Sequence, residues 1–250
     1  MINKFIKLKK LRVVLNYDEA AIEILNDVIN YIDEISSRVA LDKLVNVCLF
    51  NKTSDMERFI ELKGLNLGVS VIPEGLLSYH EAWEGIPTVY LCHEIRNRYG
   101  DAMLRALVHH ELTHALLHGE LTYYILPADI DYGDLTVVES YILFVGVKDF
   151  EVSSFLKEIG LGTHQEALIR YHLQNVEFNE TLVKTILFLL PFTDLFAYVD
   201  NEIKRIFRKW IKDLNALMYL KDSLIGINTF NKFKGVVDWY LKYWPRNSKC

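Results

Sequence analysis

Residues 107–120, LVHHELTHALLHGE, concentrate side chains that can bind a metal ion and transfer protons. Within them His110, Glu111 and His114 fit the pattern HExxH. Helical residues four positions apart lie about 6 Å apart along the axis and about 40° apart around it, so two imidazoles can converge on one ion. We therefore predict one Zn²⁺ bound by His110 and His114, with Glu111 as general base towards water. The alternative is a pair of histidines on a helix surface that binds no metal.

Two further histidines lie in the same stretch. His109 is about 100° around the helix from His110, so it should face elsewhere. His118 lies about 12 Å along the axis from His110, too far for a shared ion while the helix continues. Gly119 could end the helix, but it follows His118. We therefore expect His118 to contact the free carbonyl groups of the helix end rather than the metal.

A catalytic zinc usually takes three protein ligands, so one must come from outside this stretch. Glu139 is the only charged residue between Asp134 and Lys148, in a run that predicts a helix. A carboxylate on so apolar a face should be buried, and burial without a partner is costly. We therefore predict Glu139 as the third ligand, with a buried salt bridge as the alternative. Weaker candidates are Glu120, Asp129 and Asp131.

The elements around these residues predict an α+β fold. Apolar runs bounded by turn residues indicate strands, and apolar residues at helical spacing indicate helices. Beyond residue 150 the pattern is almost entirely helical, so we predict two domains, 1–150 and 151–250. The predicted strands are 5–14, 44–50, 67–72 and 87–92, and the main predicted helices are 19–37, 55–63, 101–119 and 134–148.

His110, Glu111 and His114 with a downstream Glu139 resemble the gluzincin metallopeptidases. The run HELTHALLH is also similar to the HExxHxLLH of ImmA/IrrE-type peptidases. The resemblance covers roughly residues 40–148. It implies a zincin-like N-terminal part, with a small mixed sheet, an active-site helix and a glutamate helix, followed by an all-helical C-terminal part.

The resemblance also implies how a substrate would be handled. Zinc would polarise the scissile carbonyl group while Glu111 delivers water and later protonates the leaving amine. Strand 88–92 would be the sheet edge to which a peptide adds as an extra strand, with an ordinary interior strand as the alternative. An oxyanion-stabilising residue is expected, and the candidates are Tyr141, His164, Tyr171 and His172.

Composition limits the class of protein. The chain of 250 residues is 51% hydrophobic and 24% charged, which excludes intrinsic disorder. Its three cysteines form no CxxC pair, so we expect a reducing compartment and a cytoplasmic location. The N-terminus lacks the apolar core of a signal peptide. Residues 181–199 are interrupted by Lys184, Pro191 and Asp194, so we expect no transmembrane segment.

The charge is distributed unevenly along the chain. Residues 201–250 hold 11 Lys and Arg against 4 Asp and Glu, a balance of +7, whereas the rest of the chain has a balance of −12. Residues 200–219 predict a basic amphipathic helix. Its polar face is best explained as a solvated face over a packed core. A nucleic-acid partner is not expected, and peripheral membrane contact is left open. The apolar stripe of this helix would be Ile203, Phe207, Trp210, Leu214 and Leu217, and its basic residues Lys204, Arg205, Arg208, Lys209 and Lys212.

The leading hypothesis is a zinc-dependent peptidase acting on a peptide or protein substrate. The alternative is a non-catalytic, zinc-binding regulatory or interaction protein, in which the basic helical C-terminal part contacts nucleic acid, a membrane surface or a protein. Glu111 favours the enzyme, because a site without catalysis has no need of the base. Metal-assisted hydrolysis of a non-peptide amide is a third possibility, which the sequence does not separate from the first.

Overall fold

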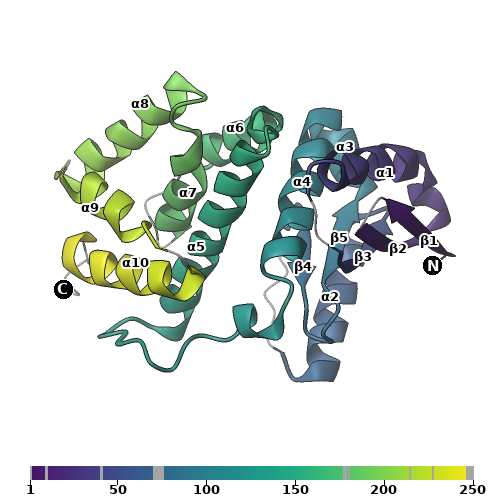
Figure 1. Cartoon of the computed structure of the whole chain (residues 1–250), viewed down its shortest axis with the longest axis horizontal. Helices are drawn as coiled ribbons and strands as arrows, with labels where there is room; N and C mark the ends of the chain where they lie inside the picture. Colours follow the sequence, from purple (N-terminus) through teal and green to yellow (C-terminus); the bar gives the residue numbers. More distant parts are fainter. Residues whose placement is uncertain are drawn as a thin grey trace. The chain divides into compact units, whose positions relative to one another are not determined.

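The computed structural model describes residues 2–8, 11–39, 42–69, 76–176, 179, 181–213, 215–226 and 228–245. The chain divides into two compact units (Figure 1). The first comprises Met1–Ile125 and His164–Leu168, and the second comprises Leu126–Thr163 and Ile169–Cys250. The first is an α+β unit and the second is mostly helical, which confirms the predicted fold class at this level. The helix that carries Glu139 therefore belongs to the second unit.

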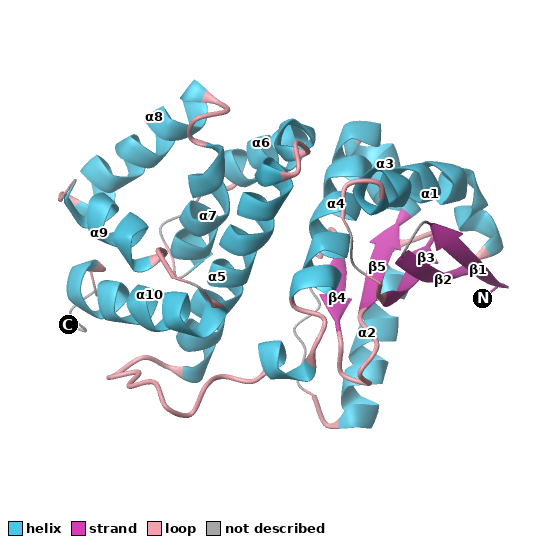
Figure 2. Cartoon of the chain, in the orientation of Figure 1, coloured by secondary structure: helices cyan, strands magenta, loops and turns pink. Residues whose placement is uncertain are grey.

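The first unit contains a mixed sheet of five described strands in the order β1-β2-β3-β5-β4 (Figure 2). β1 pairs antiparallel with β2, β2–β3 and β3–β5 are parallel, and β4 pairs antiparallel with β5. The predicted strands 44–50 and 87–92 are confirmed as β3 and β5. The single strand predicted at 5–14 is wrong, because two antiparallel strands occupy this region. The bounds are β1 Ile2–Leu8, β2 Leu11–Tyr17, β3 Leu44–Phe50, β4 Tyr79–Glu81 and β5 Thr88–Cys92.

The described sheet has β1 at one edge and β4 at the other, so β5 is an interior strand. Because β5 lies between β3 and β4, the prediction that 88–92 forms the edge is wrong. β4 has three residues and the sequence YHE, so it offers neither the length nor the apolar alternation by which a strand is recognised. All five residues of β5 are buried, as expected for an interior strand.

Successive side chains of a strand point to opposite faces of the sheet, so the strand register assigns each residue a face. On one face Phe50 and Tyr90 contact Phe59 of α2. Tyr79 pairs with Tyr90 and therefore shares that face, whereas His80 pairs with Val89 and faces the opposite way. The opposite face is the one that α4 covers, because His80 contacts Glu111 there.

The helices of the first unit pack around this sheet. α4 contacts α1, α3 and the strands β4 and β5 (Figure 1). The predicted strand 67–72 is wrong at its start, since Leu67 ends α2 and Gly68 caps it with φ 71°; residues 70–72 lie outside the described part. The bounds are α1 Ile22–Ser36, preceded by the 3₁₀ turn Glu19–Ala21, then α2 Thr53–Leu67, α3 His93–Tyr99, α4 Asp101–Leu117 and the 3₁₀ turn Leu121–Tyr124.

In the second unit α5 packs against α7 and α10. At Gly146 of α5, an added Cβ would lie 3.0 Å from the Cα of Lys184 in α7, so this close packing requires glycine. No helix in the described part of the chain has the length and apolar character needed to cross a membrane. The helices after residue 125 are α5 Val137–Glu158, α6 Glu166–Gln174, α7 Thr181–Leu189, α8 Ala197–Ile206, α9 Asn215–Ser223 and α10 Thr229–Tyr243, with 3₁₀ turns at Gly162–Gln165 and Leu190–Phe192. The segment His164–Leu168, which includes the start of α6, belongs to the first unit.

The basic helix predicted at 200–219 is not continuous. α8 passes into a π-helical turn, Phe207–Ile211, which ends at Lys212 with a left-handed φ of 58°, and α9 begins at Asn215. Ile203, Phe207 and Leu217 are buried, while Leu214 lies outside the described residues. Lys204 pairs with Asp200 and Arg205 with Glu202. The basic residues thus cover a packed core, and part of their charge is neutralised within α8.

Candidate active site

The two histidines of the HExxH motif converge as predicted. The Nε2 atoms of His110 and His114 are 3.1 Å apart, and both side chains are buried. Two imidazole nitrogens that share a tetrahedral zinc ion, each at 2.0–2.1 Å, lie about 3.3 Å apart. The pair therefore fits two positions of such an ion, and these residues could hold a metal.

The carboxylate of Glu111 is held by two side chains from the region around β4. Ser78 donates its hydroxyl hydrogen to Oε1 at 2.6 Å, and Nδ1 of His80 lies 2.7 Å from Oε2. Burial raises the pKa of Glu111, but the hydrogen bond and charge of His80, the charge of His110 and the hydrogen bond from Ser78 outweigh it and lower the pKa below its usual value. Glu111 is therefore ionised at neutral pH and can accept a proton.

Sequence reasoning missed both Ser78 and His80. His80 also stacks on His114, with ring centroids 4.1 Å apart and an interplanar angle of 9°. One imidazole thus contacts both the predicted base and a predicted ligand. The available signal was weak: a histidine between aromatic and acidic residues, about thirty positions before the motif.

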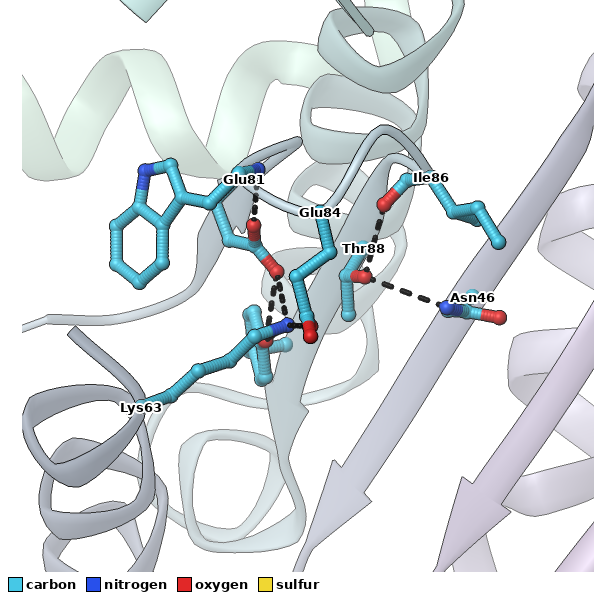
Figure 3. Close-up of polar contacts among 8 residues, drawn as sticks. Asn46, Lys63, Glu81, Glu84, Ile86 and Thr88 are labelled. Atoms are coloured by element: carbon cyan, nitrogen blue, oxygen red, sulfur yellow. Dashed lines mark hydrogen bonds and ion pairs between the residues drawn. The ribbon is translucent and has the colours of Figure 1, made fainter. Parts of the chain in front are cut away.

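A buried polar network holds β4 in place. The buried carboxylate of Glu81 accepts hydrogen bonds from Lys63 Nζ at 2.8 Å, Tyr90 Oη at 2.9 Å and the backbone N–H of Trp83 at 2.6 Å. Figure 3 shows the Lys63 amine between Glu81 and Glu84. Burial lowers the pKa of Lys63, but the hydrogen bonds to Glu81 and Glu84 outweigh it and raise the pKa. These contacts join β4 to α2 and β5, and so position His80.

His118, the last histidine of the motif region, contacts His114 rather than lying apart from the site. Its Nδ1 atom is 3.2 Å from Nδ1 of His114, and its ring packs edge-on against Tyr123. His118 was expected to contact the free carbonyl groups at the end of α4. One of these, the carbonyl of Leu116, instead accepts a hydrogen bond from Lys43 Nζ at 2.6 Å.

His109 faces away from His110, as the helix geometry predicts. Its Nε2 atom lies 2.9 Å from Glu34, and Nδ1 of His164 lies 3.9 Å from the same carboxylate. Burial lowers the pKa of His109 to about 4, although the charge of Glu34 opposes this. These three side chains offer potential ligand atoms within 4.8 Å of one another. Both oxygens of Glu34 already accept hydrogen bonds from Arg105, at 2.6 and 2.9 Å. The ion pair between Glu34 and Arg105 therefore explains why the Glu34 carboxylate lies here, without a metal ion.

Glu139 lies in the second unit, and its predicted burial is wrong: the residue is partly exposed. Its Oε2 accepts hydrogen bonds from Thr136 N at 2.8 Å and Thr136 Oγ1 at 2.7 Å, and its own N–H donates to Thr136 Oγ1. This is a capping box, and the sequence signal T-x-x-E was present at 136–139. Asp149 is the buried carboxylate of α5. The role of Glu139 as a metal ligand stays a prediction.

The remaining candidates occupy ordinary surroundings. Glu120, Asp129 and Asp131 are exposed, and Asp131 accepts a hydrogen bond from the backbone N–H of Gly133. Of the candidates for oxyanion stabilisation, His164 lies against His109 in the first unit. The other three lie in the second unit: Tyr141 on α5 beside Lys148, and Tyr171 and His172 on α6, where His172 packs on Phe188.

The site therefore combines two facing imidazole nitrogens, a carboxylate on the same helix and two side chains that hold this carboxylate. Such a set can bind a divalent metal ion and accept a proton from water. No family model matches the chain, and no curated protein or solved structure matches it significantly. What the protein does is therefore inferred from these side chains.

Proposed function

We propose that this protein is a zinc-dependent hydrolase of peptide bonds, with a zincin-like first unit. The observation that carries the proposal is the distance of 3.1 Å between His110 Nε2 and His114 Nε2. The ionised carboxylate of Glu111 follows His110 directly in the sequence. Zinc is the metal favoured by two imidazoles in a HExxH helix. Glu139 remains the predicted third ligand.

The side chains of the first unit divide the chemistry between them. A Zn²⁺ ion, when bound, supplies a Lewis acid that polarises a carbonyl group and makes water more acidic. Glu111 takes the proton from the attacking water and passes it to the leaving nitrogen. Ser78 and His80 hold the two carboxylate oxygens and leave each a lone pair for this transfer.

The position of β4 favours a peptide as the substrate. This strand is the edge of the sheet next to α4, and no second described strand pairs with it. An extended peptide can add to such an edge through backbone hydrogen bonds. We therefore propose that the peptide binds along Tyr79–Glu81 and not along residues 88–92, so that it would pass beside Glu111.

The test combines metal content with cleavage of a mixture of unstructured peptides, followed by mass spectrometry. Wild-type protein should contain about one zinc ion per chain and cleave peptides in a manner abolished by a chelator. Glu111→Gln should keep the zinc and lose cleavage, whereas His110→Ala should lose both. A wild-type chain that binds no zinc would refute the proposal. Equal cleavage by the wild type and Glu111→Gln would also refute it, and zinc binding without any cleavage would favour the non-catalytic alternative.

A further inference from the structure

We propose that His118 is a positioning residue for the metal ligand His114: it accepts a hydrogen bond from His114 Nδ1–H and so leaves the Nε2 lone pair of His114 free for the metal. This inference rests on the proposed function. It gives a role to a histidine that helix geometry excludes from sharing one ion with His110 and His114.

The contacts of His114 set a constraint on its protons. Its Nε2 atom faces His110 Nε2 at 3.1 Å, and its Nδ1 atom faces His118 Nδ1 at 3.2 Å. A neutral imidazole carries one proton, so a lone pair at Nε2 requires the proton at Nδ1. His118 must then accept at Nδ1 and carry its own proton at Nε2. The opposite assignment would place a proton on the atom that should bind the metal.

The chain holds His118 firmly for this role. His118 is the C-cap residue of α4, directly after Leu117; its backbone N–H donates to His114 O at 2.7 Å, and its side chain is buried. Its ring meets Tyr123 with centroids 5.0 Å apart at 65°. A Cβ at the next residue, Gly119, would lie 2.2 Å from Ala115 O, so only glycine lets the chain turn this closely over the helix end.

Partners of this kind are a general requirement of metal-binding histidines. A ligand histidine usually donates its second N–H to a carboxylate, a carbonyl oxygen or water, and losing that partner typically weakens metal binding about 10- to 100-fold. Here the partner is a neutral imidazole, four residues further along the same chain. The i,i+4 spacing that brings His110 to His114 thus also brings His118 to the other side of the His114 ring.

The test measures zinc affinity by competition with a chromophoric chelator, together with the visible spectrum of the Co²⁺-loaded protein. His118→Phe keeps a ring against Tyr123 but removes the acceptor, and we expect affinity to fall about 10- to 100-fold. His118→Asn restores an acceptor and should recover part of the loss. His93→Phe is the matched control, since His93 is a buried histidine of the same unit that contacts Glu23 instead; it should bind zinc like the wild type.

A second measurement needs no variant. Long-range ¹H–¹⁵N correlation spectra of the zinc-loaded wild type should show His118 protonated at Nε2 and unprotonated at Nδ1. His118 protonated at Nδ1, or an affinity of His118→Phe equal to that of the wild type, would overturn this inference while leaving zinc binding and the proposed function intact. A wild-type chain without zinc affinity would overturn both.

Discussion

His80 and Glu111 lie 31 positions apart in the sequence, and their side chains meet with Nδ1 of His80 2.7 Å from Oε2 of Glu111. The same imidazole stacks on His114. Orientation of the predicted base and of a predicted ligand is therefore coupled through one residue of the edge strand.

Replacing His80 should impair the chemistry more than metal binding. His80→Phe keeps a ring to stack on His114 but removes the hydrogen bond to Glu111, so the carboxylate is less well placed. Since a displacement of about 1 Å can cost roughly 100-fold in rate, we expect kcat to fall by about that factor with one zinc ion retained. Steady-state kinetics and metal analysis of the same sample test this. His80→Gln, which keeps a donor, should recover part of the rate, and an unchanged kcat in His80→Phe would contradict the prediction.

Breaking the network under β4 should destabilise the first unit. Lys63→Met leaves the carboxylate of Glu81, whose side chain is 0% exposed, without its cation. Removing one partner of a buried pair costs about 3–5 kcal/mol, and the lower end applies here because Lys63 is partly exposed. Urea unfolding measures the loss. The double variant Lys63→Met, Glu81→Gln should recover part of it, whereas the exposed control Lys52→Met should change stability by less than about 0.5 kcal/mol.

Glu139→Gln separates a capping role from a ligand role. Glutamine also fits the capping box, so the free energy of unfolding of the zinc-free protein should stay near that of the wild type. An amide is a poor zinc ligand, so the predicted ligand role requires zinc affinity to fall at least about tenfold. Chelator competition measures this. Affinity equal to that of the wild type would refute Glu139 as a ligand.

The thiol of Cys48 should resist alkylation in the folded protein. The pKa of Cys48 is raised from its ordinary value of 9.0 to about 12, mainly because the thiol is buried. Burial also raises the pKa of Cys92. A raised thiol pKa favours the neutral form, so at pH 8 only about one Cys48 in ten thousand is a thiolate, and the thiolate is the reactive species. Iodoacetamide labelling followed by peptide mass spectrometry should find both residues unmodified in buffer and modified in urea. Labelling of Cys48 at the unfolded rate would contradict the burial.

The pKa of Cys48 also predicts a loss of stability in alkali. The unfolded chain loses the thiol proton near pH 9 and the folded chain only near pH 12, so this group stabilises the fold below pH 9 and the contribution disappears as the pH rises from 9 to 12. The free energy of unfolding of Cys48→Val should therefore fall less steeply than that of the wild type between pH 9 and 12. Parallel pH profiles of the two proteins would show that Cys48 is not involved.

Local spacing was enough to predict the centre of the site. His110 and His114 converge, and His109 turns away, because 3.6 residues per turn determine both relations within a single helix. The strands β3 and β5 were also readable from their apolar runs. The capping box at Thr136 and Glu139 was also predictable from the local pattern T-x-x-E. The prediction of a buried Glu139 considered only the apolar helix around it and not this pattern.

Only the tertiary structure decided what surrounds the motif. That β4 forms the edge, and that Ser78 and His80 reach Glu111, depends on strand order and register, which join residues about thirty positions apart and leave no local periodicity. The sharp turn after His118 also depends on packing, since Gly119 lies against the Ala115 carbonyl and Pro87, which is more than thirty positions away. The motif thus determined two candidate ligands and a candidate base, because helix geometry is local. The fold decided which side chains support them, because packing between elements joins residues far apart in the sequence.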